Sequence, residues 1–395
     1  IYGEREYTVD WVDDLIYRLN YSDNTAWVES NYIQIGHGVG DENAYYGEIS
    51  IPSHITYNDV TFTVTGIDGA FAEAPVTTLH IPETVEWISP YSFVKMQHLK
   101  SVTVDEANPA FMTEDGILYS RDKKQLWLYP ALRTGMDGDE DKRYEEFVVP
   151  EGVEEIYSGF LGSGLKKISL PTTLKKLNGG GLSCETLTEI TLPKSLEYIG
   201  PSCFADTQIP SALHIPDNVS CIEYTCIARS LFTSVNVPEG ITHLKPYTFS
   251  NSPNLESVTL SEKLEKIDMA FDRCRKLTHI YCLGPTPPEV DSSVPLGLEK
   301  NRLGKVIVHV RPGYGEAYMQ TPWKEVGPIV EDLECGVEEI GEESAILDDE
   351  LCDAYTIAGA AMASNIKYSE MRANLTKGLY IIRTASGKTA KIAVE

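Results

Sequence analysis

One short pattern returns along this chain every 22 or 23 residues: an apolar residue, a second apolar residue two positions on, and then proline. Residues two apart in a strand point to the same side, so the two apolar side chains would share one face. Proline has no backbone N–H to donate and therefore ends the strand. The fullest copies occupy residues 79–82, 168–171, 190–193, 213–216 and 235–238. Because one short strand cannot bury its own apolar side, the repeats are predicted to stack into a solenoid.

The rest of each repeat follows a template that is clearest between Val237 and Leu260. Its other apolar positions are Ile241, Leu244, Phe249, Leu255 and Val258. We expect these side chains to fill the core, with the half around the phenylalanine turning back along an opposite wall. One strand in every 20–30 residues is typical of leucine-rich repeats. The predicted fold class is therefore mainly β: a right-handed leucine-rich-repeat solenoid of about nine repeats of 22–23 residues.

The stretch between residues 104 and 149 is about twice the usual length. It holds two apolar runs, at residues 116–119 and 126–130, separated by a charged turn at 120–125, which predicts a β-hairpin inserted into the solenoid wall. In the polar loop at 134–142, Asp137, Asp139 and Asp141 alternate as at the start of a calcium-binding loop. Lys142 stands where that loop needs glycine, and Val148 where it needs glutamate. We therefore predict no metal site.

Residues 267–277 read Ile-Asp-Met-Ala-Phe-Asp-Arg-Cys-Arg-Lys-Leu. With the strand and proline that flank such segments, they form a string that resembles the BspA-like leucine-rich repeat of bacterial surface proteins. The hairpin insertion is similar to a variant of that family, and residues 281–288, followed by Gly315-Glu-Ala-Tyr and Trp323, are similar to its closing repeat. The resemblance covers roughly residues 45–330, and it implies surface display and adhesion.

The end of the chain carries a second resemblance. Residues 353–359, 375–383 and 387–394 look like a C-terminal sorting domain of the type IX (Por) secretion class, which implies a small β-sandwich. A small all-β module with no working export signal fits the same residues. The predicted organisation is an N-terminal β-rich cap at 1–50, the solenoid at 51–330, an acidic linker at 331–350 and the β-sandwich tail at 351–395.

The net charge of −26 limits the classes of partner. Nucleic acids and anionic membrane surfaces bind basic patches, so neither is an expected partner. No apolar run approaches the length of about 18 residues that a membrane-spanning helix needs. The chain begins on Ile1 instead of methionine. We therefore expect an extracellular or cell-surface protein whose signal or lipid anchor has been removed from the N-terminus.

The eight cysteines form no C-x-x-C pair and no zinc-binding spacing. Cys184 and Cys274 fall at a repeated position of the core, where a buried thiol behaves as a small apolar group. We predict free thiols in the core, with disulfides between adjacent repeats as the alternative.

The motifs of common enzyme classes are missing from the sequence. It contains neither a G-x-S-x-G elbow nor an H-E-x-x-H zinc motif. The residues Gly387-Lys-Thr match the end of the phosphate-binding loop motif G-x-x-x-x-G-K-[ST], but Ile382 stands where the first glycine of that motif belongs. We predict no catalytic residues, no cofactor and no enzymatic activity. A hydrolase with carboxylates brought together across repeats is the alternative, although no pair can be nominated.

The residue between the two apolar residues of each strand should point away from the core. Read along the solenoid, this position gives a polar row of candidate binding residues: His80, Thr103, Ser169, Thr191, His214, Asn236, Thr259 and Tyr281. Hydroxyl, amide and imidazole groups spread over many repeats suit a broad contact with a protein or a glycan. The alternative is a solvated face whose threonines serve strand propensity.

These observations predict a non-enzymatic, adhesin-like interaction protein, secreted or displayed at the cell surface. It would bind a protein or glycan of the host or of neighbouring cells through the polar row. The alternative function is a structural spacer or scaffold of the cell envelope that has no ligand of its own.

Overall fold

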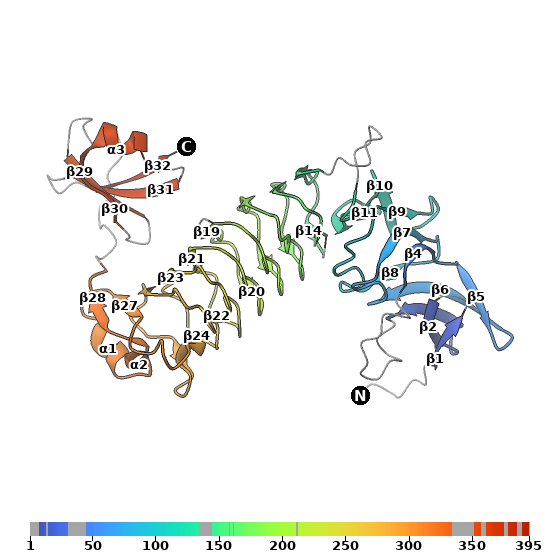
Figure 1. The fold of residues 1–395 in the computed structure, drawn as a ribbon, viewed down its shortest axis with the longest axis horizontal. Coiled ribbons are helices and arrows are strands. Elements are labelled where there is room, and N and C mark those ends of the chain that lie inside the picture. The colour runs from blue at the N-terminus through green and yellow to red at the C-terminus, as the bar shows by residue number, and fades with distance from the viewer. Residues whose placement is uncertain are drawn as a thin grey trace.

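The computed structural model describes residues 8–12, 15–30, 45–133, 144–157, 159–160, 162–210, 212–333, 351–356, 361–374, 378–384 and 389–394. Its repeats stack into an arch with strands along two walls (Figure 1). The predicted mainly β leucine-rich-repeat solenoid is confirmed, while its right-handed course stays a prediction. None of the described helices is long and apolar enough to cross a membrane.

The first wall consists of the strands that the proline pattern predicts. They pair in parallel within three sheets of three, three and six strands. The first sheet holds β4 (Gly47–Ser50), β7 (Val76–Ile81) and β9 (Ser101–Val104). The second holds β13 (Glu146–Val148), β15 (Lys167–Ser169) and β17 (Glu189–Ile190). The third holds β19 (Leu213–His214), β21 (Ser234–Asn236), β23 (Ser257–Leu260), β25 (His279–Cys282), β27 (Ile307–Val310) and β28 (Ile329–Glu331).

The second wall consists of shorter strands, mostly two residues long, which also pair in parallel from repeat to repeat. They are β8 (Trp87–Ile88), β14 (Glu155–Ile156), β16 (Lys176–Leu177), β18 (Tyr198–Ile199), β20 (Cys221–Ile222), β22 (His243–Leu244), β24 (Lys266–Ile267) and β26 (Glu289–Val290). In Figure 1 the arch opens on the side of β20, β22 and β24, and β19, β21 and β23 follow its outer side.

The N-terminal region forms a sheet that continues past the predicted cap boundary at residue 50. Its strands are β1 (Thr8–Val12), β2 (Leu15–Asn20), β3 (Thr25–Glu29), β5 (His54–Tyr57) and β6 (Val60–Asp68). Strand β6 also pairs in parallel with β8 of the first repeat. The cap is therefore continuous with the second wall.

The predicted hairpin insertion is confirmed. Strands β11 (Ile117–Ser120) and β12 (Gln125–Leu128) pair antiparallel, and β10 (Phe111–Glu114) adds to the outer side of β11. Strand β12 then pairs in parallel with β14. The insertion thus continues the second wall and does not interrupt it.

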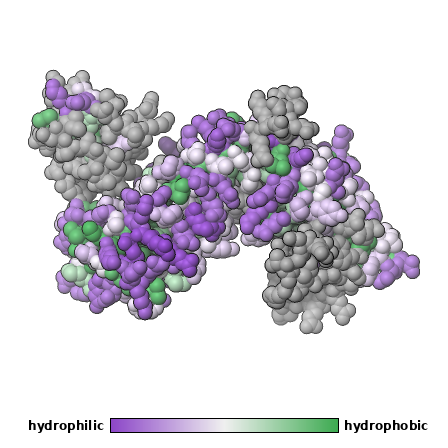
Figure 2. Space-filling view, in the orientation of Figure 1, coloured by the Kyte–Doolittle hydropathy of each residue, from purple (hydrophilic) through white to green (hydrophobic). Residues whose placement is uncertain are grey.

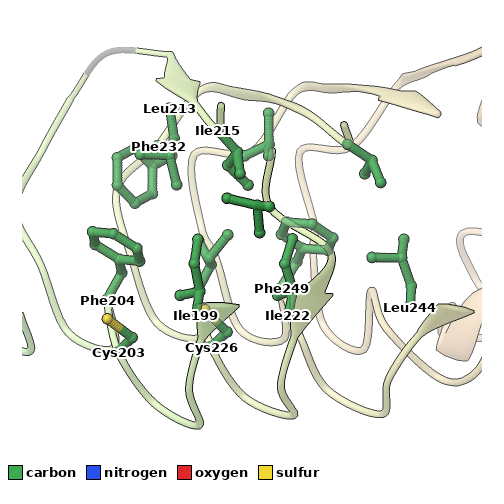
Figure 3. Close-up of a cluster of buried hydrophobic side chains, with 14 of the residues drawn as sticks. Ile199, Cys203, Phe204, Leu213, Ile215, Ile222, Cys226, Phe232, Leu244 and Phe249 are labelled. Atoms are coloured by element: carbon green, nitrogen blue, oxygen red, sulfur yellow. The ribbon is translucent and has the colours of Figure 1, made fainter. Parts of the chain in front are cut away.

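The core lies between the two walls and contains the predicted apolar positions. In the template repeat, Ile241, Leu244 and Phe249 are each at most 1% exposed. Phenylalanine rings from successive repeats stack, as Phe249 does on Phe271 with ring centroids 5.1 Å apart. Figure 3 shows Ile199, Ile222 and Leu244 extending from the second wall towards Leu213 and Ile215 of the first.

The described cysteines are free thiols, and five of them are core residues of the solenoid: Cys184, Cys203, Cys226, Cys274 and Cys282. Burial raises the pKa of Cys203 and of Cys274 to about 12, so these thiols stay protonated and behave as apolar groups.

The solenoid closes with η3 (Pro295–Gly297), α1 (Gly315–Met319) and α2 (Trp323–Val326). Trp323 is fully buried there and donates from Nε1 to the carbonyl of Pro288. The C-terminal module has one antiparallel sheet in the order β30 (Ala361–Lys367), β29 (Leu351–Thr356), β31 (Gly378–Thr384) and β32 (Thr389–Val394), together with α3 (Tyr368–Asn374). A second sheet, as in a β-sandwich, is not among the residues described, so the sandwich and the sorting role stay predictions.

Three sequence features lie outside the described residues: the loop with Asp137, Asp139 and Asp141, the glycine and lysine of the phosphate-loop imitation, and residues 334–350 of the predicted acidic linker. The first residues assigned to that linker are described, and Glu331 belongs to strand β28. The solenoid therefore extends a few residues further than predicted.

Candidate interaction surface

The structure divides the predicted polar row among the three sheets of the first wall. His80 and Thr103 are partners in the first sheet, where His80 Nδ1 lies 3.0 Å from Thr103 Oγ1. Ser169 ends β15 in the second sheet, and Thr191 directly follows β17. The other four predicted residues lie in the third sheet: His214, Asn236, Thr259 and Tyr281. The row is therefore continuous only in this third sheet.

The prediction that every row residue is accessible is wrong at one position. Thr259 is only 8% exposed. It lies in register between Asn236 and Tyr281, and these longer side chains flank it on the neighbouring strands. The accessible groups of the third sheet are therefore His214, Asn236 and Tyr281.

The row continues beyond Tyr281 into a cluster that the sequence pattern did not reveal. His309 on β27 is the register partner of Tyr281, and the two rings stack with centroids 4.6 Å apart. His279, two residues before Tyr281, also stacks on His309 at 5.1 Å. Asp332 follows β28 and contacts His309. We call His279, Tyr281, His309 and Asp332 the terminal cluster.

Hydrogen bonds connect three members of the terminal cluster in series. His309 Nδ1 lies 2.8 and 2.9 Å from the two carboxylate oxygens of Asp332. A carboxylate accepts, so this nitrogen carries a proton and His309 Nε2 is left as an acceptor. His279 Nδ1, 2.9 Å from that Nε2, then donates to it. The remaining nitrogen, His279 Nε2, is available as an acceptor towards solvent or a ligand.

Burial is the largest cause that lowers the pKa of His279. A second proton taken up by His309 would lower it further, while Asp332 and Glu256 act in the opposite direction. His279 is thus held mainly neutral at physiological pH. The cluster is chemically suited to accepting and donating hydrogen bonds.

The second wall carries a different outward surface. Trp127 and Tyr157 stack nearly parallel, with centroids 4.0 Å apart. The Tyr157 hydroxyl donates to Glu155, which also pairs with Lys176 of the next repeat. A similar ion pair joins Lys245 to Glu223, and a hydrogen bond joins His243 to Asp268. The charged side chains of this wall therefore largely pair with one another.

Aromatic residues beside the isoleucine of the second-wall strands went unnoticed in the sequence. Tyr198 precedes Ile199, and Tyr224 is 49% exposed two residues after Ile222. Tyr91 of the first repeat lies close to Tyr224 on the second wall. Burial raises the pKa of Tyr91, and the nearby Tyr224 raises it further. The signal that could have found these residues is an aromatic residue within three positions of the isoleucine of the short strand.

The described residues offer no candidate metal centre, since no three histidine, cysteine or carboxylate side chains gather closely enough to hold an ion. The surface visible in Figure 2 is mostly hydrophilic over the repeats, with scattered hydrophobic residues. Together with the polar first wall, this arrangement distributes polar groups over many repeats.

Three solved structures are similar to this chain. A leucine-rich repeat protein from Eubacterium ventriosum is 21% identical to this chain, with a TM-score of 0.41. The match covers 59% of this chain and 54% of that protein, so this chain spans about half of that protein's length. The pneumococcal vaccine antigen PcpA is 16% identical with a TM-score of 0.36, over 84% and 99% of the two chains. A leucine rich cell surface protein from Faecalibacterium prausnitzii is 17% identical with a TM-score of 0.29, over 84% and 96%. All three come from bacteria.

Among curated proteins, none matches the sequence. A family model described as the BspA type leucine rich repeat region matches in six copies, over residues 65–111, 140–231 and 182–286. These ranges include the central strands of both walls and the core between them. The repeats that build the arch are thus of BspA type, and through them the chain belongs to the BspA-type leucine-rich repeat family.

Proposed function

We propose that this chain is a non-enzymatic interaction protein, secreted or displayed at the cell surface, that binds an extracellular protein or glycan through the outward face of the first wall. The observation that carries the proposal is the register of the third sheet, which sets His214, Asn236, Thr259, Tyr281 and His309 side by side. Neighbouring strands lie about 4.8 Å apart, so these five positions extend over about 19 Å.

The chemistry of the third sheet supports recognition by many weak contacts. His214 and Asn236 are polar and at least partly exposed, and Asn236 can both donate and accept hydrogen bonds. Tyr281 adds an aromatic ring with a hydroxyl group, a type of side chain that often contributes most of the affinity at an interface. The row therefore combines one aromatic anchor with several polar contacts.

The terminal cluster fixes the geometry of that anchor. The Tyr281 ring stacks on His309, whose orientation is set by its hydrogen bonds to Asp332 and His279. A side chain held in place before binding loses less conformational entropy when a partner arrives. This end of the row is therefore where we expect the strongest contacts.

The test is binding of the complete chain to an array of extracellular-matrix proteins and glycans, followed by titration of any partner found. We expect saturable binding that Tyr281→Ala weakens by about tenfold or more, since an aromatic anchor contributes roughly 2 kcal/mol. Substitutions His80→Ala and His214→Ala should have smaller effects. Asp217→Ala, an exposed residue of the turn after β19, is the matched control.

Saturable binding that none of the three row substitutions changes would place the interaction on another surface and contradict the proposal. Absence of binding to every component of the array, by a chain that unfolds cooperatively, would instead support the spacer or scaffold.

A further inference from the structure

The strongly acidic chain has one hollow whose charged groups are mostly cationic. It lies where the turn before β25 meets the closing repeat, and it is lined by Arg275, Glu299, Lys300, Asn301 and Arg302. Arg273 lines a smaller depression that shares Arg275, Glu299 and Arg302. In the hollow itself one carboxylate accompanies three cationic side chains, although the net charge of the whole chain is −26. A locally positive charge of this kind attracts an anion to the hollow.

Arg302 is the best positioned of these cations. Its Nη2 donates to the carbonyl oxygen of Leu277, which fixes the guanidinium in the wall of the hollow. Its Nε is buried and has no hydrogen-bond partner among the described groups. A buried N–H that lacks an acceptor destabilises the protein unless a ligand or water supplies one. Arg302 therefore holds a fixed guanidinium in the wall of the hollow, with one N–H that lacks an acceptor.

The other donors of the hollow are accessible. The Arg275 side chain is 74% exposed, and its closest carboxylate contact is a loose one, 3.8 Å from Glu299. Lys300 and Asn301 are exposed, and no ion pair joins Lys300 to another described residue. Two guanidinium groups, an ammonium group and an amide can therefore converge on one ligand without first breaking a strong internal contact.

We propose that this hollow, here called the Arg275–Arg302 hollow, is a binding site for a compact oxyanion, the sulfate or phosphate ester group of a larger ligand. A tetrahedral oxyanion accepts several hydrogen bonds at once, as these donors require. A long polyanion is disfavoured because the rest of the acidic chain repels it. The proposal goes beyond the proposed function, because it does not use the polar row of the first wall.

Glu299 gives the site a means of telling the two oxyanions apart. A phosphate ester retains a proton on a fraction of molecules near neutral pH and can donate it to a carboxylate, whereas a sulfate ester only accepts. Glu299, with its side chain 31% exposed, lies within the hollow. Phosphate should therefore bind better than sulfate as the pH falls towards 6, and Glu299→Gln should remove that preference.

The experiment is calorimetric titration of the complete chain with inorganic sulfate and with inorganic phosphate, at constant ionic strength set with sodium chloride. We expect saturable binding with a millimolar dissociation constant. Arg275→Gln and Lys300→Gln should each weaken binding several-fold, and Arg302→Gln by about tenfold, the loss of one charge-assisted donor. Lys263→Gln, an exposed lysine on another turn, should bind as the wild type does.

Arg302→Gln also loses the contact with Leu277, so thermal unfolding is measured for every variant. The two exposed substitutions, Arg275→Gln and Lys300→Gln, keep the test valid if Arg302→Gln is destabilised. The proposal is overturned if neither anion binds saturably to the wild-type chain, or if the double variant of Arg275 and Lys300 binds both anions as tightly as the wild type. Stronger binding of sulfate than of phosphate at every pH would contradict the role given to Glu299 and would support a sulfate ester as the natural group.

Discussion

The two walls of the arch are built from the same repeats but treat their outward side chains differently. On the second wall, Glu155 pairs with Lys176, Glu223 with Lys245 and His243 with Asp268, each pair joining neighbouring repeats. In the third sheet of the first wall, the row residues His214 and Asn236 form no such pairs among the described residues. The second wall thus uses its polar groups to connect repeats, while His214 and Asn236 of the first wall remain available to a partner.

This difference separates stability from recognition within one repeat. A charge that is paired across repeats must lose that partner before it can bind another molecule, whereas an unpaired amide or imidazole only has to lose water. Substitutions on the second wall should therefore change the free energy of unfolding. Substitutions of unpaired first-wall residues such as His214 and Asn236 should change binding and leave stability nearly unaltered.

The largest effect is expected from a residue that supports both walls. Phe249 is fully buried and stacks on Phe271. Phe249→Ala should lower the free energy of unfolding by about 3–5 kcal/mol, because it removes a buried ring and leaves a cavity. Tyr247→Ala, two residues earlier and 40% exposed, is the control, with an expected change of about 0.5 kcal/mol or less. Urea denaturation measures both, and equal losses would show that the phenylalanine column is not the shared support.

A smaller effect should distinguish the walls directly. Glu155 accepts a hydrogen bond from the Tyr157 hydroxyl at 2.9 Å and pairs with Lys176 at 3.0 Å, and its side chain is only 20% exposed. Glu155→Gln should cost about 1–2 kcal/mol of unfolding free energy. Asn236→Ala on the first wall should cost about 0.5 kcal/mol or less. If the two substitutions destabilised the chain equally, the contrast between the walls would fail.

The smallest effect is a pH dependence that arises at the terminal cluster. Burial and the neighbouring His309 place the pKa of His279 below its ordinary 6.5 in the folded chain. The unfolded chain therefore binds this proton more tightly, so the contribution to stability is complete above pH 6.5 and is lost as the pH falls below it. Replacing His279 with glutamine should flatten the decline of the unfolding midpoint between about pH 7 and pH 5.

The control for this pH series is His54→Gln, because His54 is exposed in the N-terminal sheet. That variant should keep the wild-type slope. An unchanged slope in His279→Gln would mean that the terminal cluster does not couple its protonation to folding.

The first wall and the core could be predicted because two physical constraints coincide in the sequence. Proline marks the end of several strands, and the interval of 22–23 residues fixes which apolar side chains meet in the stack. The hairpin was visible for the same reason, since its two apolar runs and charged turn interrupt the interval. Where the interval holds, the residues that share a face can be read directly.

The terminal cluster was missed because the interval does not hold there. Cys282 and Val310 are register partners, but the closing repeat separates them by more than 23 residues, so His309 could not be aligned with Tyr281. Asp332 was assigned to the acidic linker because of the charges around it. On the second wall, strands of two residues are too short to show alternation, so Tyr198 and its neighbours gave no periodic signal.

The last strand of the first wall limits how far such a stack can extend. Within the described residues no strand pairs with the outer edge of β28. The backbone N–H and C=O groups of an unpaired edge can form hydrogen bonds with a strand of another chain. Glu331 and Asp332 lie at this edge, the first accepting from the Gly315 N–H and the second from His309. A second copy of the same acidic chain would meet these carboxylates with its own. The acidic edge of β28 therefore opposes tail-to-tail pairing of two chains through this strand.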